Sequence, residues 1–427
     1  MSFVYKPPTE WIPPDSFPTE KLCQATEIAI DLETRDPSLK ELGPGYIRGD
    51  GEVVGISFAI DGYEDYFPFA HEQGFNFSKK KVIEFTKKIC ATDSDKIFHN
   101  SSYDVGWLTR EGVPINGRII DTMVVAPLID ENQYWYSLNA LGREYINEGK
   151  TEGELNAAAE EWGLDPKAEM WRLPSAYVGT YATQDAALTL KLWNHFKILL
   201  EEQNLWNVFD LEMRVLPVIL AMKQKGVRVD TDRAQSLKKQ LIKREKDIVQ
   251  QIKDESGVPE LQLWAANSLA KVFDAMNLTY LRTPTGMPSF TKAFLENHSH
   301  PIANLIREAR EVNKTHSTFI DSILKHAHNG RIHAEIRQLK GESGGTVTGR
   351  LSMSNPNLQQ VPARNKEIGP LIRSLFLPEE GELWCSADFS QQEPRILTHY
   401  ASRSKYDGAD AIAEAYHAGD ADFHQEV

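Results

Sequence analysis

ATEIAIDLET, residues 25–34, predicts the strand around which the first half of the chain folds. Residues 26–32 are mostly apolar or β-branched, as in a buried strand that ends in acids. Because side chains alternate along a strand, Asp31 and Glu33 point to the same face. The two carboxylates can therefore bind one metal ion together.

Further strands and helices are expected downstream. Apolar, β-branched runs follow at 53–60, 66–69 and 96–99. Helical periodicity occurs at 78–91, 102–111 and 174–200. Strands that come first, with helices between and after them, predict a mixed α/β domain of roughly 200 residues.

Two more acidic segments fall on the expected helices. HNSSYD, residues 99–104, places Asp104 at a helix start, and YATQD, residues 181–185, lies within a longer helix. Tyr181 and Asp185 are four residues apart and therefore share a helix face. Each residue taken singly has a simpler explanation, because isolated acids on helices are usually solvated and tyrosines at this spacing are usually packed.

Four carboxylates without His or Cys in the same set favour magnesium. Mg²⁺ prefers carboxylate oxygens and keeps waters and substrate phosphate oxygens, as in sites that cleave phosphodiesters. Two ions about 3.5–4 Å apart can activate a water and stabilise the departing oxygen, and Mn²⁺ is an alternative metal. Tyr181 would orient that water through a hydrogen bond, because a phenol is a poor base at neutral pH.

These three segments, in this order, resemble the motifs of the 3′–5′ proofreading exonucleases of the DEDD superfamily, in the version whose last motif is Tyr-x-x-x-Asp. The resemblance spans residues 25–200 and implies an RNase H-like fold in a domain of residues 1–203. It also implies two-metal hydrolysis at a single-stranded 3′ end of DNA. The residues implied to bind the metals or to act in catalysis are Asp31, Glu33, Asp104 and Asp185, with Tyr181 positioning the water.

Residues 204–335 are expected to be mainly helical. Amphipathic patterns lie at 231–253, 267–276 and 302–327, and Asp232 is a candidate N-cap for the first of them. Eleven Lys or Arg residues stand against four Asp or Glu residues between positions 214 and 253, which suits a surface that contacts DNA. The same charges also fit the solvated face of an ordinary helix.

Two segments further along resemble family-A DNA polymerases, of the bacterial DNA polymerase I and phage replicative type. They are TGRLSMSNPNLQQVP at 348–362 and SADFSQQEPR at 386–395. The resemblance implies a polymerase thumb at 204–335, followed by an incomplete α+β palm and the start of the fingers at 336–427. LWCSAD, residues 383–388, is expected to run as a buried strand.

The polymerase resemblance also implies roles for particular residues. Asp388 would bind two catalytic metal ions with help from the carbonyl of Phe389, and Arg350 would contact the primer end. The other residues implied to bind nucleotide or DNA are Gln391, Glu393, which would exclude ribonucleotides, and His424, which would contact the triphosphate.

The family's palm and fingers motifs are incomplete before Val427. Neither the second palm carboxylate nor the fingers helix is found, so this chain alone is expected not to extend a primer. We therefore expect part of a replicative DNA polymerase that binds a single-stranded 3′ end and primer–template. A second polypeptide would then supply the rest of the palm and fingers and allow dNTP binding.

Two other functions also fit the sequence. The first is a stand-alone Mg²⁺-dependent 3′–5′ exonuclease whose downstream region only binds DNA. The second is a non-catalytic DNA-binding fragment.

Composition and charge set the remaining expectations. The net charge of −14 is concentrated upstream, where residues 130–165 hold nine acidic and two basic side chains. No apolar run approaches the ~20 residues that a membrane span requires, and no secretion signal opens the chain. Three scattered cysteines fit a reducing compartment, so the expected location is the cytoplasm of a bacterial or phage-infected cell.

Overall fold

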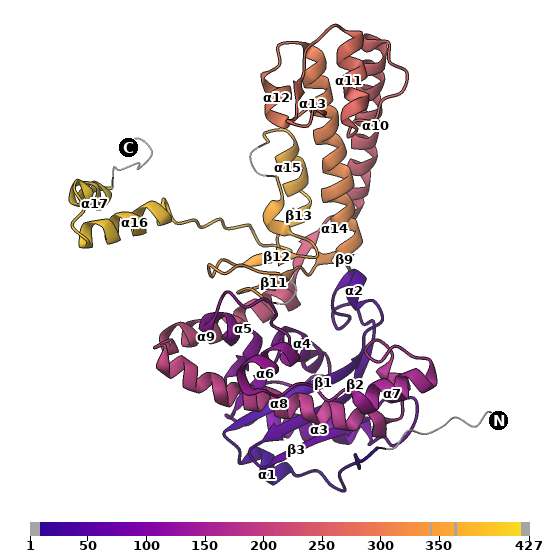
Figure 1. Cartoon of the computed structure of the whole chain (residues 1–427), viewed down its shortest axis with the longest axis vertical. Coiled ribbons are helices and arrows are strands. Elements are labelled where there is room, and N and C mark those ends of the chain that lie inside the picture. The colour runs from indigo at the N-terminus through magenta and orange to yellow at the C-terminus, as the bar shows by residue number, and fades with distance from the viewer. Residues whose placement is uncertain (1–8, 342–343, 363–364, 420–427) are drawn as a thin grey trace, which may run out of the picture. The chain divides into compact units, whose positions relative to one another are not determined.

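The computed structural model describes residues 9–341, 344–362 and 365–419 of the chain (Figure 1). The chain divides into two compact units, Met1–Leu377 and Pro378–Val427. The domain boundaries predicted at residues 203 and 335 both fall within the first unit and stay predictions. Among the described residues, no helix combines the length and the apolar character that crossing a membrane requires.

A five-stranded sheet forms the centre of the first 200 residues (Figure 1). Its order is β3-β2-β1-β4-β5, with β1 antiparallel to β2 and parallel to β4. The sequence predicts the first four strands and misses the last, whose three residues are too few for a periodic pattern. The bounds are β1 Glu27–Arg35, β2 Glu52–Ile60, β3 Tyr63–Pro68, β4 Asp95–Phe98 and β5 Ile119–Asp121.

Helices surround this sheet. They are α1 Thr19–Cys23, α2 Leu39–Leu42, α3 Lys79–Cys90, α4 Ser101–Arg110, α5 Thr122–Ile129, α6 Leu138–Ile146, α7 Gly153–Trp162, the 3₁₀ turn η1 Met170–Arg172, α8 Ser175–Glu202 and α9 Trp206–Lys225. The long helix α8 packs against β1, β2 and β3, and it buries Trp193 and Phe196 in the same apolar core as Trp107 of α4. The three helices that the sequence predicts here correspond to α3, α4 and α8. The mixed α/β class is therefore confirmed.

The next part of the first unit is mainly helical, as expected. Helix α10, Thr231–Ser256, packs along α13, Pro301–Lys314, through apolar side chains such as Leu241 and Ile306. The N-cap of α10 is Asp230, which accepts a hydrogen bond from Arg233 N at 2.9 Å. The expectation of Asp232 as the cap was wrong, because the helix begins one residue before it. The other helices here are α11 Ala266–Ala275, α12 Lys292–Asn297, the π-helix η2 Thr315–Ile320, α14 Asp321–His326 and α15 Ile368–Arg373.

Short strands connect these helices. A four-stranded sheet has the order β13-β6-β10-β9, and two further pairs of strands are β7 with β8 and β11 with β12. The segment 348–362 contributes β12 and the 3₁₀ turn η3. The bounds are β6 Val227–Val229, β7 Leu281–Arg282, β8 Pro288–Ser289, β9 Ala327–His328, β10 Arg331–Ile332, β11 Glu335–Arg337, β12 Ser352–Ser354, η3 Leu358–Gln360 and β13 Phe376–Leu377.

The described part of the second unit, residues 378–419, contains two helices, α16 Gln392–Arg403 and α17 Ala409–Ala418, which pack on each other. The buried strand expected at 383–388 is wrong, because these residues form no regular element and are exposed. Leu383 is 92% exposed and Trp384 61%. A strand needs a neighbouring strand for its backbone hydrogen bonds, and none of the described strands pairs with this segment.

Candidate functional site

Three of the predicted metal ligands converge beside the second half of β1. Asp31 and Glu33 extend from β1, and Asp185 extends from α8. One carboxylate oxygen from each lies within 4.8 Å of the other two. Glu33 and Asp185 are buried and Asp31 is partly exposed, so the cluster is shielded from bulk water on most sides. It joins segments about 150 residues apart in the sequence.

Asp104 lies beside this cluster in the first turn of α4. Its Oδ1 accepts a hydrogen bond from the backbone N of Leu32, at 3.2 Å, between the two acids of β1. Burial raises the pKa of Asp104 well above its usual range, and the charge of Asp31 adds to the rise. The structure therefore brings all four predicted acids into one region, with Asp104 adjacent to the group of three.

The acids of the cluster resist ionising together. Burial raises the pKa of Asp31 to about 7, with a further contribution from the charge of Asp185. Burial and the charge of Asp31 also raise the pKa of Glu33 well above its usual range. Buried carboxylates of this kind become stable in the charged form when a cation offsets their repulsion.

The donor set fits a hard divalent cation. All of the clustered ligand atoms are carboxylate oxygens, which Mg²⁺ and Mn²⁺ prefer to nitrogen or sulfur. Asp185 Oδ1 is buried and accepts no hydrogen bond within the described part of the chain. This oxygen thus keeps a lone pair for an ion.

Tyr181 lies one helical turn before Asp185 on the same face of α8, as expected from the spacing. Its side chain is buried, and burial together with the charge of Asp185 raises the pKa of the phenol far above its usual value. Tyr181 is therefore a neutral hydroxyl at all physiological pH values. It can orient a water molecule but cannot act as a general base.

Sequence reasoning missed Lys150, which reaches into the cluster from the segment between α6 and α7. Its Nζ donates hydrogen bonds to Tyr181 OH at 3.1 Å and to Asp185 Oδ2. Although burial disfavours its charge, the carboxylates of Asp185 and Asp31 keep the pKa of Lys150 above its usual value. No periodic pattern marks a lysine between Gly149 and Thr151, so only the folded chain identifies it.

The residues implied by the polymerase resemblance belong to other segments of the chain. Arg350 is an exposed residue of the first unit, where its backbone carbonyl accepts a hydrogen bond from Thr346 Oγ1 at 2.6 Å. Asp388 and Phe389 are exposed in the irregular segment before α16. Gln391 is the N-cap of α16 and accepts a hydrogen bond from Tyr416 OH at 2.9 Å, Glu393 lies in the first turn of that helix, and His424 falls outside the described residues.

The basic run on α10 has two kinds of side chain. Lys238 pairs with Asp321 at 2.5 Å, and Arg244 pairs with Glu308 at 2.6 Å. Lys239, Lys243 and Lys246 are exposed. The ion-paired residues stabilise the helical region, and the exposed ones are available to solvent or to phosphate groups.

Comparison with known proteins finds two family models. Residues 18–201 match the model described as 3′-5′ exonuclease, and residues 231–427 match the model described as DNA polymerase family A. Together they include Asp31, Glu33, Asp104, Asp185 and Asp388.

Relatives extend over nearly the entire chain. The DNA-directed DNA polymerase of Pseudomonas phage M6 is 36% identical over 95% of this chain and 64% of its own length. DNA polymerase DpoZ of Acinetobacter phage SH-Ab 15497 is 34% identical over 95% of this chain and 66% of its own. DNA polymerase I of Pseudomonas aeruginosa is 28% identical over 90% of this chain and 41% of its own. The chain thus spans less than two thirds of the length of these relatives.

A solved structure shares the fold. The POL domain of Pol1 from M. smegmatis, in complex with DNA primer-template and dNTP, matches 90% of this chain and 60% of its own with a TM-score of 0.69. Its sequence identity to this chain is 21%, so the likeness concerns the fold.

Proposed function

Because the chain belongs to family A of the DNA polymerases and carries a 3′–5′ exonuclease domain, we propose that it removes nucleotides from single-stranded 3′ ends of DNA as a proofreading nuclease. The observation that carries the proposal is the convergence of Asp31, Glu33 and Asp185 within 4.8 Å. This arrangement gathers hard oxygen ligands where a phosphodiester could approach from the partly exposed side of Asp31.

The acidic residues of the site would bind metal, and Tyr181 would orient the attacking water. Asp31, Glu33 and Asp185 would hold two Mg²⁺ ions, with Asp104 anchoring the second. When bound, such ions activate a water and stabilise the departing oxygen. The neutral hydroxyl of Tyr181 orients the attacking water by a hydrogen bond, and the buried walls around Glu33 and Asp185 limit competing water.

A 3′-labelled single strand tests the proposal. With Mg²⁺ the label should be released stepwise, and EDTA should stop the release. Asp31→Ala should lower the rate at least about 10²-fold, because a metal ligand is lost. The matched control is Asp61→Ala, which removes an exposed acid in the turn between β2 and β3 and should leave the rate unchanged. Equal rates for wild type and Asp31→Ala would refute the nuclease assignment.

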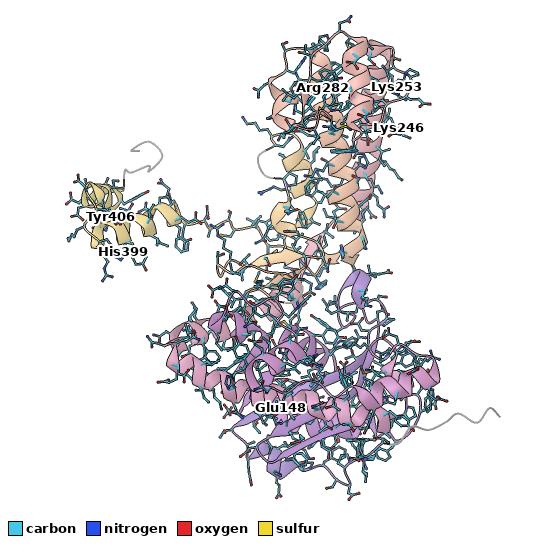
Figure 2. All side chains as sticks on the ribbon, in the orientation of Figure 1. Glu148, Lys246, Lys253, Arg282, His399 and Tyr406 are labelled. Carbon is cyan, nitrogen blue, oxygen red and sulfur yellow. The ribbon has the colours of Figure 1, made fainter. Side chains whose placement is uncertain are left out.

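A second activity, primer extension, is supported by the family match over residues 231–427. We infer that Arg350, Gln391, Glu393 and His424 bind primer–template or dNTP. Asp388 and the Phe389 carbonyl would bind Mg²⁺. The exposed lysines of α10 would contact duplex phosphates. Figure 2 labels Lys246 and Lys253 on this helix, together with Arg282 from the same helical region.

We further propose that palm and fingers residues corresponding to the unmatched third of such relatives, supplied by a second polypeptide, take part in primer extension. The support is that the chain covers 64% of the phage M6 relative. Adding a polypeptide that corresponds to the remaining third of such a relative should produce dNTP incorporation, and Asp388→Ala should abolish it. Extension by the chain alone, or an inactive folded mixture, would show that the complementation proposal is incorrect.

A further inference from the structure

The ammonium group of Lys150 lies inside the carboxylate site. Lys150 Nζ donates a hydrogen bond to the hydroxyl of Tyr181 and another to Oδ2 of Asp185, so it contacts both functional residues of the YATQD segment. The ammonium also lies 5.0 Å from the centroid of the Tyr181 ring. The Lys150 side chain is 18% exposed and that of Asp185 is 3% exposed, so solvent screens this ion pair only weakly.

The backbone around Lys150 is held in place by side chains of two helices. Asn139 of α6 accepts a hydrogen bond from Lys150 N at 2.9 Å. Gln184 of α8 donates to Gly149 O at 3.0 Å and accepts from Thr151 N at 2.5 Å. Gln184 directly precedes Asp185, so the segment that carries the lysine is fastened to α8 next to the metal ligand. These hydrogen bonds fix the backbone that carries Lys150, and the fixed backbone in turn restricts where its ammonium group can lie.

The two oxygens of Asp185 have different partners. Lys150 occupies Oδ2, and Oδ1 is buried without a hydrogen bond from the described residues. A carboxylate that accepts a hydrogen bond at one oxygen is restricted in rotation, and one oxygen of Asp185 belongs to the cluster that Asp31 and Glu33 complete. Tyr181 is fixed by the same ammonium.

We propose that Lys150 is a positioning residue of the nuclease site: it holds Tyr181 and Asp185 in a fixed relation and offsets part of the negative charge of the carboxylates. The inference rests on the proposed exonuclease function and extends it to a residue outside the three acidic segments. Lys150 touches neither the water nor the phosphate in this role. It acts through Tyr181, which orients the water, and through Asp185, which holds the metal.

Three variants test the role of Lys150. Lys150→Met keeps the length of the side chain but removes the charge and the donors, and Lys150→Arg keeps both. Lys191→Met is the matched control, because Lys191 of α8 forms a comparable ion pair with Glu148 at 2.6 Å on the surface, where Figure 2 labels the glutamate. Each full-length protein is assayed for Mn²⁺ binding without DNA and for kcat and KM on a 3′-labelled single strand.

In Lys150→Met the affinity for Mn²⁺ should rise while kcat falls. Removing a positive charge beside the carboxylates should tighten Mn²⁺ binding about tenfold, because an ion–ion repulsion is lost at short range. The kcat should fall about 10²-fold with KM within threefold, because misplaced catalytic groups slow chemistry more than binding. Lys150→Arg should recover at least tenfold in kcat, and Lys191→Met should match wild type in both assays.

General structural damage would weaken Mn²⁺ binding and lower kcat together, and that result would overturn the inference. Unchanged Mn²⁺ binding, or a kcat within threefold of wild type for Lys150→Met, would overturn it as well. If wild type releases no nucleotides, the proposed nuclease function fails. The Mn²⁺ comparison, which needs no substrate, then still decides whether Lys150 acts on the metal ligands.

Discussion

Ionising an acidic residue of the carboxylate cluster costs more free energy than ionising an acid on the surface. Burial and the charge of Asp185 together bring the pKa of Asp31 to about 7, far above the value of about 4 for a solvated aspartate. The folded protein consequently binds a proton at pH values where the unfolded chain has released it. Stability is therefore greatest at low pH for this group and is lost as the pH rises toward the folded-state pKa.

The first prediction concerns how the cost of ionising Asp31 depends on pH when EDTA keeps the protein free of metal. Asp31→Asn should unfold at higher urea concentration than wild type, because the amide carries no charge. The free energy of unfolding of Asp31→Asn minus that of wild type should grow by about 2 kcal/mol from pH 5 to pH 7. This difference should stay constant above pH 7.5. Urea titrations at pH 5, 6, 7 and 8 measure it.

Asp61→Asn provides the comparison, since this acid is exposed in a turn. Its unfolding free energy should track that of wild type throughout. Saturating Mg²⁺ should reverse the order of wild type and Asp31→Asn, because the metal stabilises only the intact site. An advantage that is the same at every pH would contradict the raised pKa.

Among the elements, the starts of α4 and α5 depend on one side chain. Asp121 Oδ1 accepts hydrogen bonds from Asn100 N and Met123 N at 2.9 Å each, and Oδ2 accepts from Ser101 N at 2.7 Å and Ser101 Oγ at 2.8 Å. The side chain of Asp121 is buried. Its contribution is polar, however, since it caps α5 and orients the first turn of α4, which carries Asp104.

The second prediction is that Asp121→Ala costs about 2–4 kcal/mol in free energy of unfolding, because four donors lose their acceptor in a buried place. Ser137→Ala serves as the control. It removes a single cap of α6, accepting from Ala140 N at 3.4 Å, and should cost about 1 kcal/mol or less. Urea unfolding followed by circular dichroism compares them, and equal costs would show that the double cap is unimportant.

Across the first unit, a buried lysine connects the nuclease part to the region that follows it. Lys223 of α9 is 1% exposed in its side chain and donates to Glu335 Oε2 of β11 at 2.7 Å and to Ser102 Oγ of α4. A cleft of about 500 Å³ adjoins this contact, and its lining includes Glu33, Ser102, Glu335 and Lys340. The carboxylate site and the start of the polymerase-like region thus share one continuous wall.

The third prediction is that Lys223→Met destabilises the protein by about 3 kcal/mol, because Glu335 is left without its buried partner. Combining it with Glu335→Gln should cost clearly less than the sum of the two single changes, which a double-mutant cycle in urea measures. Lys238→Met, which breaks the partly exposed pair with Asp321, should cost under about 1 kcal/mol. Additive costs for Lys223 and Glu335 would show that the pair is not coupled.

Local patterns in the sequence predict much of the first unit. The strand that carries Asp31, the helices α3, α4 and α8, and the long helix α10 all follow from periodicity and from residues close in sequence. The same spacing places Tyr181 and Asp185 on one helix face. These features depend on contacts within a few residues, which a linear pattern records.

Other features depend on partners far away in the chain. Lys150 meets Asp185 across 35 positions, and Lys223 meets Glu335 across 112. The strand expected at 383–388 does not form, since β-structure requires a second chain segment to accept its hydrogen bonds. The types and spacing of the acids therefore come from the sequence, whereas their shared cluster and the lysine among them arise only when folding joins distant segments, because charge and hydrogen bonding act over a few ångströms in space regardless of separation along the chain.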